Sequence, residues 1–123
     1  MKKLTLIFCC ILITYSAFSQ TLDSQPTSKI AVLEFSPLFV DCGIMAMAYG
    51  LKFKLINTNY FFVVIIPCPE AYGKYFFIQG NKYIIETSKI TNIDSAYRDY
   101  TIVNPYKKYN LPTYSVVNIK KHK

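Results

Sequence analysis

Six consecutive apolar residues, Phe61-Phe62-Val63-Val64-Ile65-Ile66, constrain the fold more than any other stretch of the chain. All of them are aromatic or β-branched, and such side chains lose rotamer freedom in a helix but pack well on a pleated sheet. The run is short for a buried helix, and Pro67 ends it by removing a hydrogen-bond donor. Because apolar and polar residues do not alternate, the run predicts a strand covered on both faces, as in the wall of a barrel or sandwich.

A β-hairpin is predicted directly after this strand. The apolar segment Tyr75–Ile78 and the apolar segment Tyr83–Thr87 flank a Gly80-Asn81 pair. Glycine and asparagine adopt positive φ at low cost, which the tight turns of hairpins require. We therefore expect two paired strands, with Gly80 or Asn81 at positive φ.

Upstream, hydrophobic residues recur with a period of two from residue 45 to residue 55. This period is typical of a long strand with one face toward the core. The residues expected on that face are Met45, Met47, Tyr49, Leu51, Phe53 and Leu55. The two methionines could also suggest a soft-metal site, but their position on the apolar face favours core filling. Gly50, where the opposite face changes from alanines to lysines, is expected at a bulge or bend.

The remaining segments complete an all-β pattern. Residues 30–35 fit either a short strand or a helical turn, and residues 90–96 fit a short helix capped by Asp94. Further strands are expected at 100–103 and 114–119, separated by a loop at 106–112. Five or six strands with at most one short helix predict a small OB-like barrel, with a β-sandwich as the alternative.

The first nineteen residues are expected to be a secretory signal peptide. Met1-Lys2-Lys3 is a positive start, Leu4–Tyr15 is mostly apolar, and Ala17-Phe18-Ser19 has the small residues of a cleavage site. An uncleaved anchor is the alternative, but Leu4–Phe18 falls short of the roughly 20 residues that span a bilayer. Export to the periplasm, the cell envelope or the extracellular space follows, with no transmembrane span in the mature chain.

Cleavage would leave 104 of the 123 residues. These divide into a polar lead-in (20–29), one β-barrel domain (30–119) and a basic tail (120–123). A single domain of this size has a modest hydrophobic core, and a covalent cross-link would increase its stability.

Two cysteines remain in the mature chain, because Cys9 and Cys10 leave with the leader. In an exported chain, Cys42 and Cys68 most simply form a disulfide. The chain-entropy model assigns a loop of this length roughly 3.5 kcal/mol of stabilisation. Two free buried thiols are the alternative.

The residues for catalysis are sparse. There is no C-x-x-C pair, the one histidine is His122 near the C-terminus, and Asp94 and Asp99 fit a surface loop. Glu70 is expected to contact Lys74 or a backbone amide. No catalytic residue, metal site or cofactor is therefore expected, and the alternative is a small hydrolase whose carboxylates converge only in the fold.

Charge and tyrosine content favour a binding role. The net charge of +7 falls to about +5 when Lys2 and Lys3 are removed with the leader. OB barrels bind oligosaccharides and oligonucleotides through aromatic and basic groups. Since an exported protein rarely meets nucleic acid, the expected partner is an envelope protein, an anionic polysaccharide or a lipid surface. The tyrosines considered are Tyr72, Tyr75, Tyr83, Tyr97, Tyr100, Tyr106, Tyr109 and Tyr114.

Two alternatives to a binding module are left open. The tyrosines could simply populate β surfaces while the positive charge aids solubility. The chain could also be a structural component of a surface assembly that shares an edge strand.

The segment from Cys42 to Glu86 resembles netrin-like modules of the tissue-inhibitor-of-metalloproteinase type, and small exported bacterial proteins of unassigned role. The resemblance rests on a strand with a central glycine, a valine-rich strand, the corner Cys68–Gly73 and the pattern F-F-x-x-G-x-x-Y-x-I. It implies an OB-type barrel. In the inhibitors an N-terminal cysteine chelates the metal of the target, whereas the expected first residue here is Gln20 and no C-x-C is present. The resemblance therefore implies the fold and not the inhibition.

Overall fold

The computed structural model describes residues 27–39, 42–43 and 45–123, so the predicted signal peptide and most of the lead-in lie outside the described residues. The elements are β1 (Thr27–Leu33), β2 (Met47–Leu55), β3 (Phe61–Pro67), the 3-10 helix η1 (Pro69–Tyr72), β4 (Lys82–Lys89), α2 (Ile93–Ala96), β5 (Thr101–Val103), the 3-10 helix η2 (Lys107–Tyr109) and β6 (Thr113–Lys121). Among these elements, no helix has the length and apolarity needed to cross a membrane.

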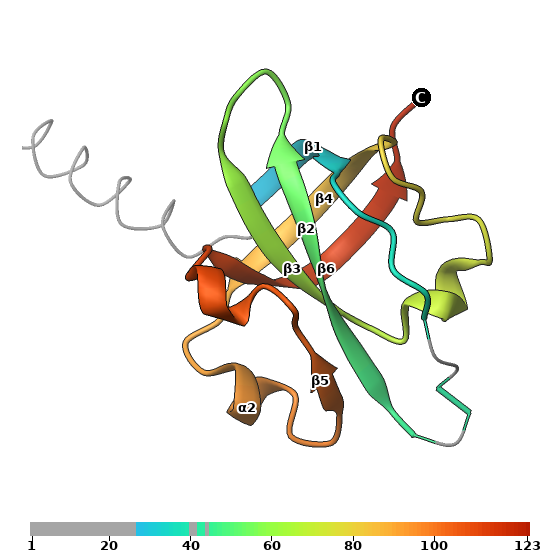
Figure 1. Cartoon of the computed structure of the whole chain (residues 1–123), viewed down its shortest axis with the longest axis vertical. Helices are drawn as coiled ribbons and strands as arrows, with labels where there is room; N and C mark the ends of the chain where they lie inside the picture. The colour runs from blue at the N-terminus through green and yellow to red at the C-terminus, as the bar shows by residue number, and fades with distance from the viewer. Residues whose placement is uncertain (1–26, 40–41, 44) are drawn as a thin grey trace, which may run out of the picture.

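Five strands close into a barrel (Figure 1). Their order is β1-β4-β6-β3-β2, and an additional pairing between β1 and β2 completes the ring. Neighbouring strands are antiparallel except β3 and β6, which run parallel. The sixth strand, β5, pairs with the start of β2 outside the ring. The prediction of a small OB-like barrel is thus confirmed, rather than the sandwich.

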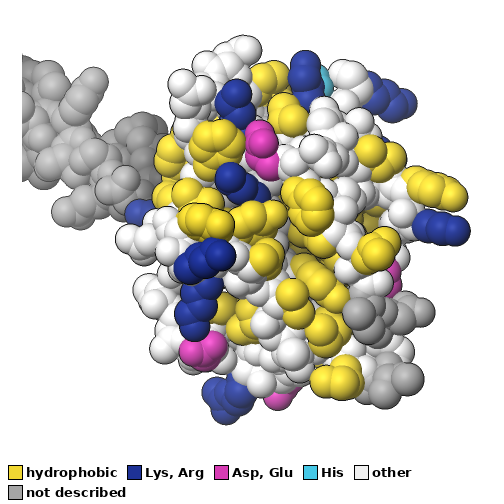
Figure 2. Space-filling model, viewed as in Figure 1, with side chains coloured by type: hydrophobic (Ala, Val, Ile, Leu, Met, Phe, Trp, Pro, Cys, Tyr) yellow, Lys and Arg dark blue, Asp and Glu magenta, His cyan; other side chains and the backbone are white. Residues whose placement is uncertain are grey.

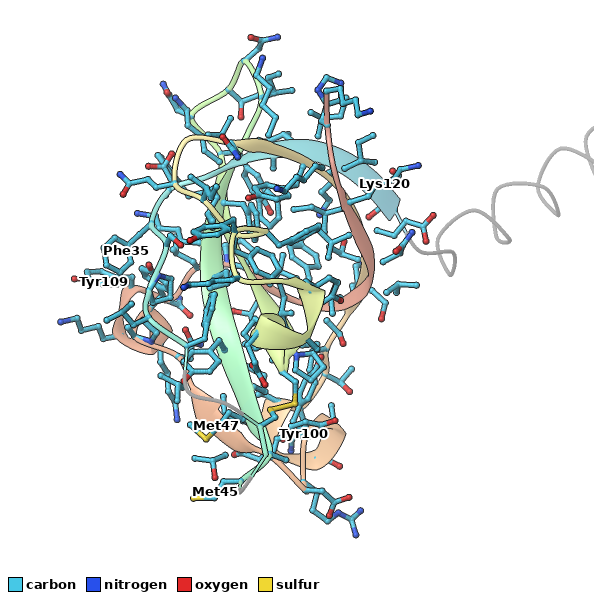
Figure 3. The ribbon with its side chains drawn as sticks, turned by 90° about the vertical axis from the view of Figure 1, so that its right-hand side faces the viewer. Phe35, Met45, Met47, Tyr100, Tyr109 and Lys120 are labelled. Atoms are coloured by element: carbon cyan, nitrogen blue, oxygen red, sulfur yellow. A yellow bond between two sulfur atoms is a disulfide. The ribbon has the colours of Figure 1, made fainter. Side chains whose placement is uncertain are left out.

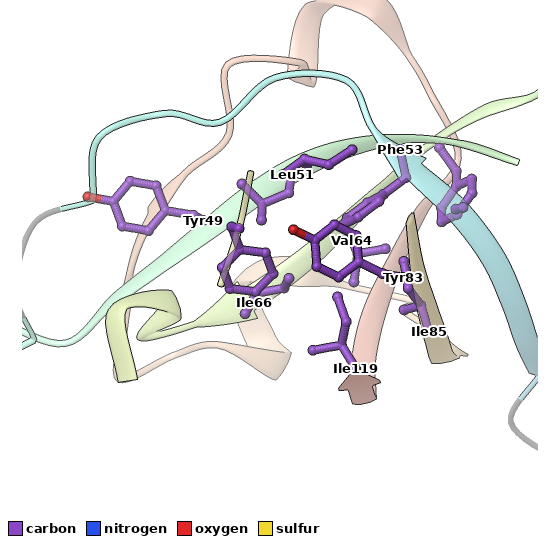
Figure 4. Close-up of a cluster of buried hydrophobic side chains, with 12 residues drawn as sticks. Tyr49, Leu51, Phe53, Val64, Ile66, Tyr83, Ile85 and Ile119 are labelled. Atoms are coloured by element: carbon purple, nitrogen blue, oxygen red, sulfur yellow. The ribbon is translucent and has the colours of Figure 1, made fainter. Parts of the chain in front are cut away.

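Strand β3 is buried on both faces, as its unbroken apolar run predicts. Phe62, Val64 and Ile66 point into the barrel and join the inner core, whereas Val63 and Ile65 join a second cluster on the outside. Figure 4 shows the inner core, in which side chains from β2, β3, β4 and β6 converge. Its residues include Tyr49, Leu51, Phe53, Tyr83, Ile85 and Ile119.

Strand β2 confirms the predicted period, with two corrections. Tyr49, Leu51 and Phe53 are buried, but Met45 precedes the strand and is 55% exposed. Pairing between β2 and β3 runs without a register shift, so Gly50 is not at a bulge. A glycine is instead needed there because the side chain of Asn104 lies against it.

The hairpin prediction is wrong for its first strand. Residues 75–78 form turns, and both edges of β4 pair with β1 and β6. The aromatic residues before β4 pack instead: Phe77 is buried in the inner core, and Phe76 packs against it. The predicted positive φ is confirmed at Gly80.

Several element boundaries differ from expectation. The segment left open between strand and helix is β1, which begins at Thr27 inside the expected lead-in. The cap of α2 is Asn92, whose side chain accepts a hydrogen bond from Ser95 N, rather than Asp94. Strand β6 runs to Lys121, two residues into the expected tail, because it pairs with β4 along that length.

Candidate binding surface

The segment between β4 and β6, residues 90–112, folds over part of the outer face of β2 and β3 (Figure 1). We call this segment the 90–112 arm. Its residue Tyr97 is buried with Ala48, Val63 and Ile65. The Tyr97 hydroxyl donates to Ile65 O at 3.3 Å and also bonds Ser115 Oγ. The arm therefore closes one half of the face that OB barrels use to bind oligomeric ligands.

The other half of this face carries lysines and aromatic rings. Lys52 and Lys54 point outward from β2, and Lys54 is paired in register with Phe61 of β3. The Lys52 ammonium lies 4.6 Å from the centroid of the Phe61 ring and 6.0 Å from that of Tyr106. Cations at such distances are attracted by the negative face of the ring.

Two exposed rings flank these residues. Phe35 follows β1 and is 54% exposed, and Tyr109 at the end of η2 is 61% exposed. In Figure 3 both rings lie toward the same side of the molecule. On the face shown in Figure 2, apolar and basic side chains are intermixed. We define the aromatic–lysine strip as Phe35, Lys52, Lys54, Phe61, Tyr106 and Tyr109.

One acidic group borders the aromatic–lysine strip. Glu34 N donates to Lys52 O at 3.0 Å, which holds the residue beside β2. Burial of the Tyr106 hydroxyl raises the pKa of this group, and the Glu34 carboxylate raises it further. Tyr106 is therefore neutral at physiological pH, and the formal charges of the strip are its lysines and the neighbouring Glu34.

A second group of aromatic residues lies where β3 begins. Tyr60 and Tyr114 share a hydrogen bond of 3.0 Å between their hydroxyls, and the Lys29 ammonium lies 3.7 Å from the centroid of the Tyr114 ring. The hydrogen bond from Tyr114, with a smaller contribution from burial, raises the pKa of Tyr60 to about 12. This pair links the start of β3 to β6.

The tyrosines considered from the sequence do not form one surface. Tyr83 and Tyr97 are buried, whereas Tyr72, Tyr75 and Tyr109 are exposed on different elements. Tyr83 is structural: its hydroxyl accepts from Ile78 N at 2.8 Å and donates to Phe76 O at 2.5 Å. Phe35 and Phe61 were not predicted as surface residues. The one signal in the sequence was the pair of lysines at 52 and 54, which indicates the outer face of β2.

The acidic residues considered as catalytic candidates lie in different parts of the fold. Glu70 accepts a hydrogen bond of 2.7 Å from the backbone amide of Cys42, one of its two expected contacts. Asp94 lines a shallow hollow of about 450 Å³ under the 90–112 arm, and Asp99 is exposed. His122 lines a hollow of about 370 Å³ together with lysines of β4 and β6. Among the described residues that line this hollow, Asp94 is the one carboxylate.

The predicted disulfide between Cys42 and Cys68 is confirmed, with the Cα atoms 5.7 Å apart (Figure 3). It joins the segment before β2 to the corner that follows β3. Such bonds are typical of proteins in oxidising compartments.

Comparisons with known proteins identify no relative of this chain. Neither a scan against protein-family models nor searches of curated proteins and solved structures find a match.

Proposed function

We propose that this protein is an exported, non-catalytic binding module whose aromatic–lysine strip holds an anionic polysaccharide. The observation that carries the proposal is the placement of lysines among exposed rings on the open half of the β2–β3 face. In this arrangement a sugar ring can lie on Phe35 or Tyr109 while a carboxylate or sulfate on the sugar meets Lys52 or Lys54. The signal peptide predicted from the sequence supports export, and the disulfide supports an oxidising compartment.

Burial and charge favour a glycan chain over a flat protein partner. Phe61 and Tyr106 are half-buried and give the strip a fixed floor, while Phe35 and Tyr109 project on either side. Rigid aromatic side chains lose little conformational entropy on binding. Lysines beside them steer anionic chains electrostatically and make binding sensitive to salt.

The 90–112 arm supports an oligomeric ligand of limited width. Its buried part occupies the half of the face beside β5, so a ligand on the strip contacts β2 only at Lys52 and Lys54, and the arm only at Tyr106 and Tyr109. Sharing of an edge strand is less favoured, since β5 lies outside the closed ring and is three residues long. Edges this short offer few unpaired backbone groups to a partner.

Calorimetric titration with oligogalacturonate, neutral dextran and anionic lipid vesicles tests the proposal. We expect oligogalacturonate alone to bind, with affinity that falls as salt is raised. The variant Tyr109→Ala should weaken binding about 5-fold, as expected from the loss of about 1 kcal/mol of ring contact. Tyr75→Ala is the matched control, since Tyr75 is an equally exposed ring, 69% exposed, on the loop after η1.

Four outcomes contradict the proposal, and three of them concern selectivity. These three are binding of vesicles but not of oligogalacturonate, equal binding of neutral and acidic glycans, and an equal loss of affinity in Tyr109→Ala and Tyr75→Ala. Absence of binding to any of a panel of uronic-acid and sulfated glycans also contradicts it.

A further inference from the structure

The region around the disulfide contains a third donor atom. Cys42 Sγ, Cys68 Sγ and a carboxylate oxygen of Glu70 all lie within 4.8 Å of one another. Each of the three residues is half-buried, so the cluster is reachable from solvent yet sheltered by the fold. Two thiolates and one carboxylate would be a suitable ligand set for zinc.

Glu70 is bonded through only one of its oxygens. Oε1 accepts the hydrogen bond from Cys42 N, whereas Oε2 is buried and has no hydrogen-bond partner among the described residues. Leaving a buried acceptor unsatisfied costs about 1–3 kcal/mol, and more for a charged group. Glu70 therefore combines an unsatisfied carboxylate oxygen with a position beside two sulfurs, and this combination requires an explanation.

We propose that reduction of the disulfide converts this cluster into a zinc site. Its ligands are Cys42 Sγ, Cys68 Sγ and a Glu70 carboxylate oxygen, with water in the fourth position. The inference is independent of the polysaccharide-binding role, because the strip and the cluster share no residue.

The spacing of the backbone suits this ligand set. The two sulfurs of a tetrahedral zinc site lie about 3.8 Å apart, given zinc–sulfur distances of about 2.3 Å. Cysteines with Cα atoms 5.7 Å apart reach that separation by side-chain rotation, without movement of the strands. Glu70 lies in η1, two residues after Cys68, so the two ligands share one short element.

Backbone groups next to the cluster orient the ligands. Met47 N donates to Cys42 Sγ at 3.3 Å, and this hydrogen bond would stabilise a thiolate at the same position. Cys68 N donates to Met47 O at 2.8 Å, which fixes the Cys68 backbone against the start of β2. Such contacts to the ligands hold a metal site in shape and raise its affinity.

The redox step needs a dithiol as the reductant. Two electrons from the dithiol break the sulfur–sulfur bond, the dithiol becomes a disulfide, and its two protons pass to Cys42 and Cys68. Zinc binding then releases these two protons to solvent as the thiolates coordinate the ion. The oxidised and the zinc-bound forms both tie the segment before β2 to the corner after β3.

Zinc competition with a chromophoric chelator tests the site on the full chain carrying Cys9→Ser and Cys10→Ser, which removes the other thiols. After treatment with a phosphine reductant, we expect one zinc per chain, and none before reduction. Cobalt substitution should give a thiolate-to-metal charge-transfer band. Glu70→Gln should weaken zinc binding at least 10-fold, whereas Glu86→Gln, a change of an exposed acid on β4, should leave it unchanged.

X-ray absorption on the reduced zinc complex of the same full chain covers the case in which Glu70→Gln does not fold. Two sulfur and two oxygen neighbours support the site. Binding at less than one zinc per chain, equal affinity in Glu70→Gln, or a shell without two sulfurs overturns it.

Discussion

Asn104 of the 90–112 arm lies directly against Gly50 of β2. A β-carbon built on Gly50 would stand 2.7 Å from Asn104 Oδ1 and 3.1 Å from Val63 Cγ1. The same Oδ1 accepts a hydrogen bond from Tyr106 N at 3.1 Å. The contact therefore fixes both the arm and Tyr106, which belongs to the aromatic–lysine strip.

Substitution of Gly50 by alanine should destabilise the fold. The new methyl group displaces the Asn104 side chain and breaks its bond to Tyr106 N, which costs about 1–3 kcal/mol as for other overpacking changes. Urea unfolding measures the loss. In a double-mutant cycle, Asn104→Ala should relieve part of the penalty, since it removes the Cγ and Oδ1 atoms. Strict additivity of the two changes would contradict the direct contact.

Removal of the disulfide should lower stability while keeping the barrel. The double variant Cys42→Ser/Cys68→Ser is expected to lose about 2–4 kcal/mol in the free energy of unfolding, because the unfolded chain is no longer constrained. On the full chain, the control Cys9→Ser/Cys10→Ser, in the predicted signal peptide, should leave the free energy of unfolding unchanged. Thermal and urea unfolding of the purified chains measure both. A loss below 1 kcal/mol would argue against a stabilising role.

The Tyr83 hydroxyl should stabilise the loop between η1 and β4. Tyr83→Phe leaves Ile78 N and Phe76 O without their bond to this hydroxyl, at a cost of about 1–3 kcal/mol. Amide hydrogen exchange should show faster exchange at Ile78 than in the wild type. Tyr75→Phe, on an exposed ring of the same loop, is the control and should change neither stability nor exchange.

Alkaline titration should reveal the bond between Tyr60 and Tyr114. The folded protein holds the Tyr60 proton with a pKa of about 12, against about 10 in an unfolded chain. The contribution of Tyr60 to the free energy of unfolding is fully present below pH 10, and it is lost as the pH rises toward 12. Spectrophotometric titration should therefore show a tyrosine that ionises near pH 12. Tyr114→Phe should shift this ionisation toward pH 10. Tyr109→Phe should leave it in place.

The sequence predicts the barrel well because its strongest signals are local. The unbroken run in β3 and the alternation in β2 determine which side chains enter the core, and both are confirmed by the buried positions of Val64 and Leu51. The disulfide prediction follows from counting the cysteines that remain after the predicted signal peptide. These features depend on periodicity and composition, which need no knowledge of the fold.

The candidate site could not be derived in the same way. Phe35 and Tyr109 are far apart in the sequence, and Tyr109 reaches this side of the molecule because the 90–112 arm folds over part of the outer face of β2 and β3. The prediction of the hairpin's first strand was wrong for a related reason. Residues 75–78 have strong strand propensity, but the rings of Phe76 and Phe77 pack in or against the inner core, while β1 and β6 occupy both edges of β4.

Chemical-shift mapping by NMR during titration with oligogalacturonate shows directly whether the aromatic–lysine strip binds an anionic glycan. We expect saturable shifts in the amides and side chains of Phe35, Lys52, Lys54 and Tyr109, with Lys89 on β4 unaffected. Shifts that centre on the hollow beside His122, or that spread evenly over all lysines, would contradict a specific glycan site on the aromatic–lysine strip.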